Sequence, residues 1–311
     1  MGRVERPVLK DAFSALGALK ASFSSPSALK EAFSAGPRGR GAAGPPRGAL
    51  GAFSATRASL GAPNAPKASL GAAPADHRLT VGTMTELPLA LVTGASRGIG
   101  AAIAHALAPT HRVLLGGRDA EALAKTAAEL PNSTPWPVDL TDPEALDRAA
   151  ADIGELDVLV HSAGVARIAT VADSTAQDWR DNFEVNVLAV VEITRRLLPA
   201  LRTAKGHVVV INSGAGQNAR PGWGPYAASK FAVRAFADSL REEEQALRVT
   251  SVYPGRTDTE MQQAIVAGEG NDYDPGRYLR PESVAAAVRT AVTASPEAHL
   301  TEVVLRPRVT R

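Results

Sequence analysis

The chain has 311 residues, which is enough for one α/β domain with a large core. It contains no cysteine, which excludes disulfides, thiolate metal sites and a cysteine nucleophile and is compatible with a cytoplasmic location. No apolar run approaches the ~18 residues of a membrane span, so no membrane insertion is predicted, and we predict no metal site either.

The formal net charge of +2 combines two opposed parts. Residues 1–83 carry 11 Lys/Arg and 4 Asp/Glu, a net charge of +7, whereas residues 84–311 carry 23 and 28, a net charge of −5. The positive charge therefore belongs to the first segment, and it does not indicate a nucleic-acid footprint on the folded domain.

Residues 1–83 form a low-complexity segment whose apolar content is mostly alanine, so disorder is predicted, with a weak helix over residues 8–33. Three interpretations remain open: a transit-type leader, a basic tail that binds a partner such as nucleic acid, or an upstream extension of the reading frame. The third is favoured because Met84 stands a few residues before the first predicted strand. The working domain is therefore predicted to span residues 84–311.

The domain begins with a strand, a glycine turn and a helix. Residues 89–92 are a short apolar run typical of a buried strand, and an alanine-rich helix is expected over residues 98–107. Gly94, Gly98 and Gly100 stand between them or at the helix start. Such a turn lets the backbone approach a dinucleotide pyrophosphate, which the helix N-terminus then attracts. A glycine-rich turn without a ligand is the alternative.

The second strand, over residues 111–117, bears on the choice of cofactor. In a dinucleotide fold, an acidic side chain near its end binds the ribose hydroxyls, whereas an arginine binds a 2′-phosphate. Here Gly117 takes the acidic position and Arg118 follows, while Arg97 in the glycine turn is a second cation. The sequence therefore favours NADP(H) over NAD(H), the alternative being two solvated arginines.

The third strand is expected over residues 135–140, after a helix at residues 120–130. Asp139 lies near the end of that strand, where ligands bind in open α/β sheets, so it is a candidate for the adenine amino group. A role as a turn residue or as the cap of the helix from Pro143 is equally compatible.

The fourth strand is expected over residues 156–161 and runs into small residues that include Ala163 and Gly164. Small residues here let the backbone lie against a cofactor. His161 ends this strand, and we interpret it as a packed, hydrogen-bonded side chain and not as a catalytic base.

A long helix follows over residues 175–203 and is expected to end at Lys205. Asn182 and Asn186 lie four residues apart on one face of it. Asparagine is unfavourable inside a helix, so a local kink that turns its side chain toward the active site is predicted.

The fifth strand, over residues 207–212, precedes Ser213. Tyr226 and Lys230 stand four residues apart at the start of the next helix, which runs to about residue 245. A lysine one helical turn away favours the phenolate and is expected to lower the pKa of the tyrosine, although an ordinary helical pair is the alternative.

Strands over residues 248–253 and 302–306 and a helix over residues 281–289 complete the domain, in which strands and helices alternate. The hydroxyls within residues 256–260 are candidates for contact with a carboxamide, and a helix cap at Thr257 or Asp258 is the alternative. Residues 262–278 are predicted to be a mobile lid. The pocket is expected to be apolar and to be lined by Trp223, Met261, Ile265 and Tyr273.

Together these motifs resemble the short-chain dehydrogenase/reductase family over residues 84–308. The matching motifs, in chain order, are the turn at residues 93–100, Asp139-Leu140, Asn186, Ser213, Tyr226 with Lys230, and Pro254-Gly255 with Thr259. The resemblance implies a single domain with a Rossmann-type, doubly wound parallel sheet. It also implies an NADP(H)-dependent oxidoreductase that acts on a small carbonyl or alcohol substrate, as a homodimer or homotetramer.

The resemblance implies that Tyr226 is the general acid/base, that Lys230 lowers its pKa, that Ser213 positions the substrate oxygen and that Asn186 holds a water of a proton relay. The residues it places at the cofactor are Gly94, Ser96, Arg97, Gly98, Ile99, Gly100, Arg118, Asp139, Ala163, Gly164, Tyr226, Lys230, Pro254, Gly255 and Thr259. Two departures are His161-Ser162 in place of two asparagines and a C-terminal Leu305-Arg306-Pro307-Arg308 in place of a glycine-rich tail. A cofactor-binding sensor or scaffold without catalysis is the alternative function.

Overall fold

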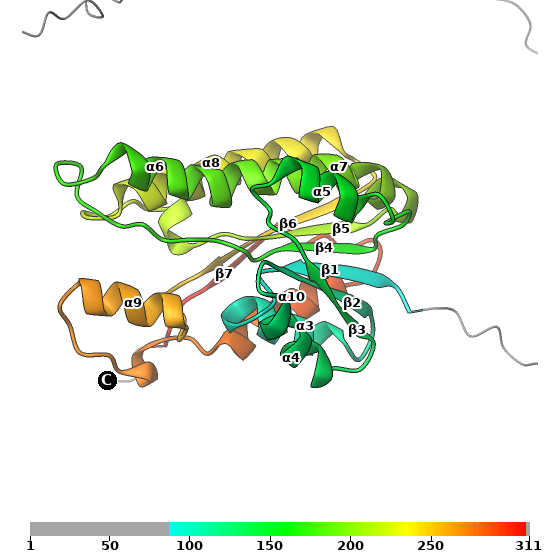
Figure 1. Cartoon of the computed structure of the whole chain (residues 1–311), viewed down its shortest axis with the longest axis horizontal. Coiled ribbons are helices and arrows are strands. Elements are labelled where there is room, and N and C mark those ends of the chain that lie inside the picture. Colours follow the sequence, from blue (N-terminus) through cyan, green and yellow to red (C-terminus); the bar gives the residue numbers. More distant parts are fainter. Residues whose placement is uncertain (1–86, 309–311) are drawn as a thin grey trace, which may run out of the picture. The chain divides into compact units, whose positions relative to one another are not determined.

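The computed structural model describes residues 87–308. This part of the chain contains one seven-stranded parallel sheet with the order β3-β2-β1-β4-β5-β6-β7 (Figure 1). The strands are β1 (Leu89–Thr93), β2 (Arg112–Gly117), β3 (Ser133–Pro137), β4 (Val158–His161), β5 (His207–Ile211), β6 (Arg248–Pro254) and β7 (Glu302–Leu305). The predicted doubly wound sheet is confirmed, whereas the predictions for residues 1–83 and the exact domain start lie outside the described residues.

Helices cover both faces of the sheet. The helices are α3 (Gly98–Leu107), α4 (Ala120–Ala128), α5 (Pro143–Ala150), α6 (Ala176–Phe183), α7 (Ala189–Ala204), α8 (Gly224–Glu243), α9 (Glu260–Gly268) and α10 (Pro281–Val292). Helices α3, α4 and α10 lie below the sheet in Figure 1, and α5 to α8 lie above it. Three short helical segments complete the list: η1 (Glu184–Leu188), η2 (Gly214–Gly216) and η3 (Pro275–Arg277).

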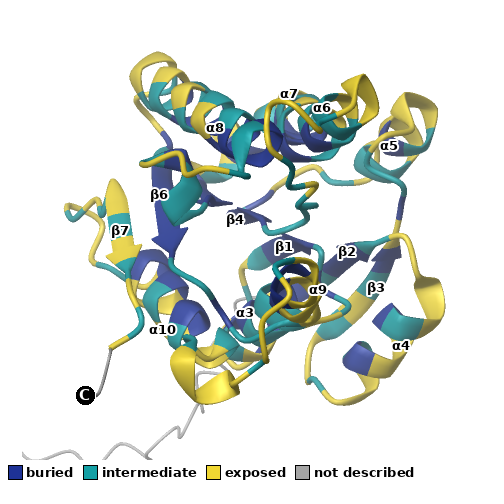
Figure 2. Cartoon of the chain, turned by 90° about the vertical axis from the view of Figure 1, so that its left-hand side faces the viewer, coloured by how far each residue is buried: buried dark blue, intermediate teal, exposed yellow. Residues whose placement is uncertain are grey.

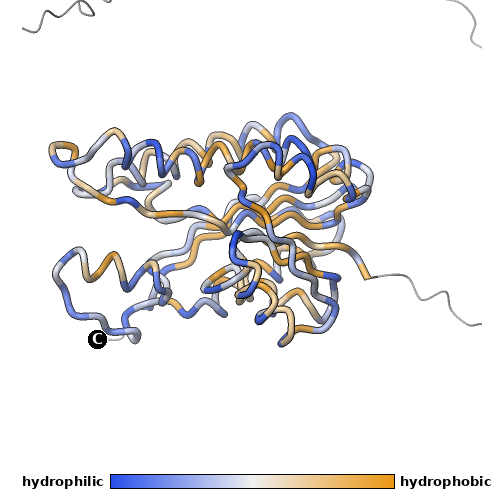
Figure 3. The backbone as a smooth tube through the Cα atoms, in the orientation of Figure 1, coloured by the Kyte–Doolittle hydropathy of each residue, from blue (hydrophilic) through white to orange (hydrophobic). Residues whose placement is uncertain are grey.

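The alternation of side chains along each strand divides the core into two parts. In β1, Ala90 and Val92 pack toward α3 and α10, whereas Leu91 packs toward α7 and α8. Both faces of the central strands are therefore apolar, as parallel sheets require, and Figures 2 and 3 show these strands as buried and hydrophobic.

The order of the strands reverses between β1 and β4, where Val92 pairs with Val160. Ligands bind at such a switch point, beyond the carboxyl ends of the strands. The Thr93 hydroxyl accepts hydrogen bonds from the backbone N–H groups of Ser162 and Ala163 at 3.1 and 3.2 Å. The turn after β1 and the loop after β4 are thus held together.

Two expectations about local structure were wrong. Strand β3 ends at Pro137, two residues before Asp139, because the chain turns there toward α5. The N-cap of α9 is Thr259, whose side chain accepts from the Gln262 N–H at 3.2 Å, and not Thr257 or Asp258. The segment at residues 262–278, predicted as a mobile lid, contains most of α9 and the turn η3, and its mobility stays a prediction.

His161 is fully buried and hydrogen-bonded, as predicted. Its Nε2 lies 2.9 Å from the Thr194 hydroxyl, which donates its own hydrogen to the Val190 carbonyl at 2.7 Å. Nε2 of His161 is therefore the donor. Burial lowers its pKa to about 3, so the ring is neutral and has a structural role.

Residues 87–308 contain neither a membrane-spanning helix nor a cluster of metal-binding side chains. No helix in this part of the chain is long and apolar enough to cross a membrane. Nor do three or more His, Asp or Glu side chains in this range gather where they could hold a metal ion.

Candidate active site

The glycine turn is shaped by three positions that exclude any side chain. A Cβ at Gly94 would lie 2.8 Å from the Ala163 backbone, and φ at Gly94 is +68°. A Cβ at Gly100 would lie 2.1 Å from the Gly94 carbonyl oxygen. At Gly98, φ is +57° and a Cβ would lie 3.3 Å from Thr259 Cγ2. These close approaches leave bare backbone at the three glycines of the turn, which fits the cradle of a dinucleotide pyrophosphate.

The N-terminus of α3 points from this turn with its backbone donors exposed to the site. The N-cap residue, Arg97, makes no side-chain cap hydrogen bond with the residues that the structure describes. The first turn of α3 contains no acidic residue. Unpaired N–H groups and a positive dipole end attract an anion.

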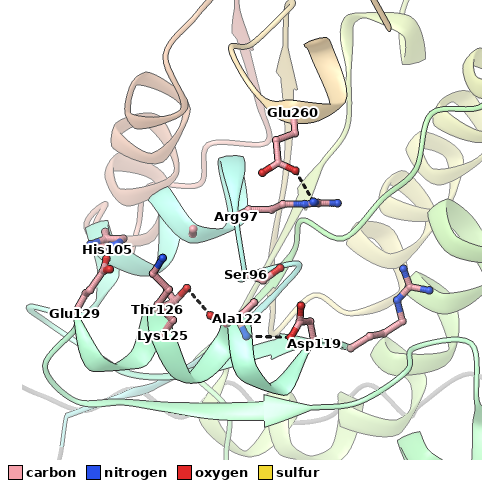
Figure 4. A pocket seen from close by; sticks show the side chains of 11 residues that line it. Ser96, Arg97, His105, Asp119, Ala122, Lys125, Thr126, Glu129 and Glu260 are labelled. Atoms are coloured by element: carbon pink, nitrogen blue, oxygen red, sulfur yellow. Dashed lines mark hydrogen bonds and ion pairs between the residues drawn. The ribbon is translucent and has the colours of Figure 1, made fainter. Parts of the chain in front are cut away.

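A cavity of about 860 Å³ lies beside the same turn, and Ser96, Arg97 and Arg118 are among its lining residues. Figure 4 shows that the Arg97 side chain reaches Glu260 of α9, with which it forms an ion pair. Both partners are largely exposed, so this pair is weak and does not prevent Arg97 from turning to a ligand. The structure therefore brings the two predicted phosphate contacts, Arg97 and Arg118, to one cavity.

Asp139 acts in this structure as a turn residue. Its carboxylate accepts from the Thr141 N–H at 2.9 Å and from the Thr141 hydroxyl at 2.8 Å, while Asp142 caps α5. These bonds, helped by nearby Arg118, lower the pKa of Asp139 although partial burial opposes them. A contact with adenine remains a prediction.

Ser213, Tyr226 and Lys230 meet beyond the end of β5. Ser213 caps the turn η2 by accepting from the Ala215 N–H at 3.1 Å, and its side chain faces Tyr226 closely enough to influence the pKa of that phenol. The Lys230 ammonium lies 5.8 Å from the centre of the Tyr226 ring and donates to the Ile211 carbonyl at 3.2 Å. Tyr226 and Lys230 are only 8% and 7% exposed, so their interaction is shielded from water.

Burial dominates the protonation of this pair. It lowers the pKa of Lys230 to about 8. It also raises the pKa of Tyr226, and the hydrogen bond with Ser213 opposes this only in part. The prediction of a lowered tyrosine pKa was therefore wrong for the protein without a bound cofactor. Removing the phenolate from water destabilises it more than the neighbouring groups stabilise it.

Asn186 lies where the predicted kink interrupts the long helix. The π-helix η1 separates α6 from α7 and contains Asn186, which is 1% exposed. Its side chain amide donates to the Val165 carbonyl at 2.9 Å and to the Ser229 hydroxyl at 3.0 Å, and it accepts from the Val165 N–H at 2.9 Å. A π-helix inserted in an α-helix is a frequent feature of functional sites.

Asn182 makes the equivalent contacts one turn earlier, with the backbone of Arg167. The two asparagines thus fix the loop after β4. A Cβ at Gly164 in this loop would lie 3.1 Å from Asn186 Oδ1 and 3.9 Å from Lys230 Nζ. Gly164 consequently lies beside the reaction centre, whereas Ala163 lies against Gly94.

A cleft of about 890 Å³ connects the reaction centre to α9. Its lining includes Ile99, Ser213, Tyr226, Pro254, Gly255 and Thr259 from the predicted set. Trp223, Met261 and Ile265 also line it, as predicted. Tyr273 is absent from the lining residues identified in the described chain, because its hydroxyl is turned to the Asp258 carboxylate at 2.5 Å.

Comparisons with known proteins decide the family. A protein-family model described as short chain dehydrogenase matches residues 88–270. The chain is 32% identical over 248 residues to dehydrogenase/reductase SDR family member 11 of Mus musculus, which covers 70% of this chain and 94% of that protein. The chain belongs to the short-chain dehydrogenase/reductase family.

Two further similarities agree with this membership. The chain is 36% identical over 236 residues to glycine betaine reductase ATRR of Emericella nidulans, but this covers 71% of the chain and only 19% of that much longer protein. An alcohol dehydrogenase from the archaeon Thermococcus sibiricus, complexed with 5-hydroxy-NADP, superposes with a TM-score of 0.67 at 28% identity, over 73% of this chain and 99% of that chain. As a short-chain dehydrogenase/reductase, the protein is an NAD(P)-dependent oxidoreductase.

Sequence reasoning missed part of the cleft of this short-chain dehydrogenase/reductase. Gln262 is 5% exposed and lines the cleft, and its Nε2 has no hydrogen-bond partner among the described residues. Five arginines also line the cleft: Arg220, Arg256, Arg277, Arg306 and Arg308. The departure of the C-terminal segment from the family pattern was the one signal in the sequence that pointed to Arg306.

Proposed function

We propose that this enzyme transfers a hydride between NADP(H) and a small carbonyl or alcohol substrate, with Tyr226 as general acid/base. The observation that carries the proposal is the buried, hydrogen-bonded group of Ser213, Tyr226 and Lys230 in the cleft next to the glycine turn.

The cofactor is NADP(H), which supplies the hydride. The backbone of the glycine turn and the start of α3 would hold its pyrophosphate, while Arg97 and Arg118 would bind the 2′-phosphate. The cofactor of the archaeal alcohol dehydrogenase that superposes on this chain is an NADP derivative, which supports this choice.

The proton is handled by the side chains of the chain itself. The hydroxyls of Ser213 and Tyr226 would donate to the substrate oxygen, and Tyr226 would give its proton to that oxygen when the carbonyl is reduced. Burial raises the pKa of Tyr226, so the phenol is in the protonated form that a proton donor requires. Lys230 would stabilise the phenolate that remains, and Asn186 would anchor the relay that restores the proton.

We also propose a homodimer or homotetramer in the cytoplasm. Leu188 of η1 and Phe231 of α8 are large apolar side chains that are 49% and 41% exposed, and both lie on the long helices expected at the interface. Such exposed apolar groups are typical of surfaces that bind another chain. The location is a prediction that follows from the cysteine-free composition.

The variant Tyr226→Phe tests the proposal. We expect kcat for reduction of a panel of ketones with NADPH to fall about 10²–10⁴-fold, because only the proton donor is removed. Affinity for NADPH, followed by fluorescence titration, should stay within about 3-fold. Tyr253→Phe is the control, because it removes a phenol hydroxyl that contacts Glu302 outside the cleft.

Retained turnover in Tyr226→Phe would contradict the assigned mechanism. A wild-type protein that binds NADPH and turns over no ketone or alcohol of the panel would instead support the sensor or scaffold.

A further inference from the structure

Arg306 places a guanidinium in the wall of the cleft beside the reaction centre. A Cβ at Gly214 would lie 3.6 Å from Arg306 Cζ, so the charged group covers the residue that follows Ser213. Arg306 comes directly after β7, the last strand, and lines the cleft together with Ser213 and Tyr226. It is therefore within reach of a substrate bound there.

The guanidinium is fixed in place by oxygen atoms that carry no charge. Nη1 donates to the carbonyl oxygens of Tyr253 and Leu305, both at 2.8 Å, and Nη2 donates to Oε1 of Gln217 at 2.8 Å. These three bonds use three of the five N–H donors of an arginine. The donors that remain are on Nε and Nη2, two adjacent nitrogens that form a fork for a carboxylate.

The charge of Arg306 is not neutralised by the chain. No carboxylate within residues 87–308 forms an ion pair with it. Arg256, in the same cleft, differs, because its guanidinium forms an ion pair with Glu269. Arg306 is thus held in position, without a carboxylate partner among residues 87–308, and keeps two N–H donors for a ligand.

The surroundings of Arg306 are also positive. Arg220, Arg277 and Arg308 line the cleft, and none of them forms an ion pair with another described residue. Asp272 and Asp274 are the acidic lining residues found in the described chain. A positive cleft in a domain of net charge −5 is a local arrangement that attracts anions.

We propose that the substrate is an oxo acid or hydroxy acid, whose carboxylate binds to Arg306 while its carbonyl or hydroxyl group meets Ser213 and Tyr226. This proposal rests on the proposed function and adds the substrate class to it. The apolar side chains of Trp223, Met261 and Ile265 then contact the hydrocarbon part of the acid.

The test compares Arg306→Gln with Arg289→Gln, a matched control that removes one exposed arginine from α10. Each enzyme is assayed with NADPH on 4-oxopentanoate and 5-oxohexanoate and on their methyl esters. In the wild type and in the control, kcat/KM for the acids should exceed that for the esters at least 10-fold. In Arg306→Gln this ratio should fall by about 10–100-fold through KM, because a charge-assisted fork is lost.

Because Arg306 also bonds β6 and β7, Arg306→Lys serves as a second variant. It keeps the charge and loses the fork, so an intermediate ratio is expected. A binding assay is independent of turnover: the enzyme with NADP⁺ is titrated calorimetrically with glutarate and with dimethyl glutarate. The wild type should bind glutarate, Arg306→Gln should bind it at least 10-fold more weakly, and neither should bind the diester comparably.

Equal activity on acids and esters in the wild type, or an unchanged ratio in Arg306→Gln, would overturn the inference and leave the proposed function standing. Absence of any turnover with bound NADPH would instead refute the proposed function. In that case glutarate decides the inference: equal binding to wild type and Arg306→Gln, or none to the wild type, refutes a carboxylate site.

Discussion

The glycine turn after β1 and the reaction centre beyond β5 are built in different ways. The turn consists of backbone packed so closely that a Cβ at Gly94 or Gly100 would overlap another part of the main chain. The reaction centre consists of side chains from separate elements, and hydrogen bonds run from Asn186 to the Ser229 hydroxyl and from that hydroxyl to the Tyr226 carbonyl. One is limited by the space available, the other by the pairing of polar atoms.

This difference teaches which changes each region tolerates. A methyl group added to the turn has nowhere to go, because the neighbouring backbone belongs to the turn itself and to the loop after β4. A hydroxyl removed from the reaction centre leaves the fold in place and removes chemistry. The glycine turn is therefore sensitive to added side-chain volume, whereas the reaction centre is sensitive to the loss of polar atoms.

The largest expected effect comes from adding volume to the turn. In Gly100→Ala the new Cβ would lie 2.1 Å from the Gly94 carbonyl oxygen. We expect the free energy of unfolding to fall by about 3 kcal/mol and NADPH affinity to fall at least 10-fold, as overpacked sites do. Urea denaturation and fluorescence titration measure both.

Gly154→Ala is the control for this substitution, because nothing lies within 4 Å of a Cβ at that glycine. Its stability should stay within about 0.5 kcal/mol of the wild type. If both alanine variants behave alike, the turn is not limited by space.

A second test concerns His161, the buried histidine that ends β4. Burial lowers the pKa of His161 from its ordinary value of 6.5 to about 3 in the folded protein, so below pH 6.5 the unfolded chain binds a proton that the folded one does not. Stability contributed by this group is complete above pH 6.5 and is lost as the pH falls toward 3. At pH 5 the loss is on the order of 2 kcal/mol.

The variant His161→Asn should lose correspondingly less stability than the wild type between pH 7 and pH 5 in urea denaturation. His105→Asn, at an exposed position, should follow the wild type. Burial also lowers the pKa of His207 to about 3. The loss of stability that His207 causes at low pH is the same in all three proteins. Parallel curves for all three would show that His161 is not buried as described.

The effect that is most restricted to one ligand should appear at the side chains that select the cofactor. Arg118→Ala is expected to weaken NADPH binding about 10–100-fold and to change NADH binding little, because the backbone turn serves both cofactors while only one carries the 2′-phosphate. Arg289→Ala is the control on the far side of α10. Equal losses for NADPH and NADH would show that Arg118 acts on the turn and not on the phosphate.

The fold followed from local patterns to a large extent. The apolar run at residues 89–92, the glycine turn and the helix start at Gly98 each depend on neighbours a few residues away, and all three were placed correctly. The kink at Asn186 could also be predicted from the sequence, because an asparagine inside a helix needs a hydrogen-bond partner. The predicted cap of α9 lay one or two residues before the observed one, Thr259. Three consecutive residues have side chains that can cap a helix, and the residue that does so depends on where the helix begins in the folded chain.

By itself, the sequence determined the doubly wound sheet, the family and the identity of the residues around the reaction, because strand and helix periods and motif spacings are properties of short segments. Only the tertiary structure decided how those residues behave together. Burial, not the Tyr–Lys spacing, sets the direction of the pKa of Tyr226. The position of Arg306 depends on the pairing of β7 with β6, so its place beside Ser213, 93 residues earlier, could not be inferred from its neighbours in the chain.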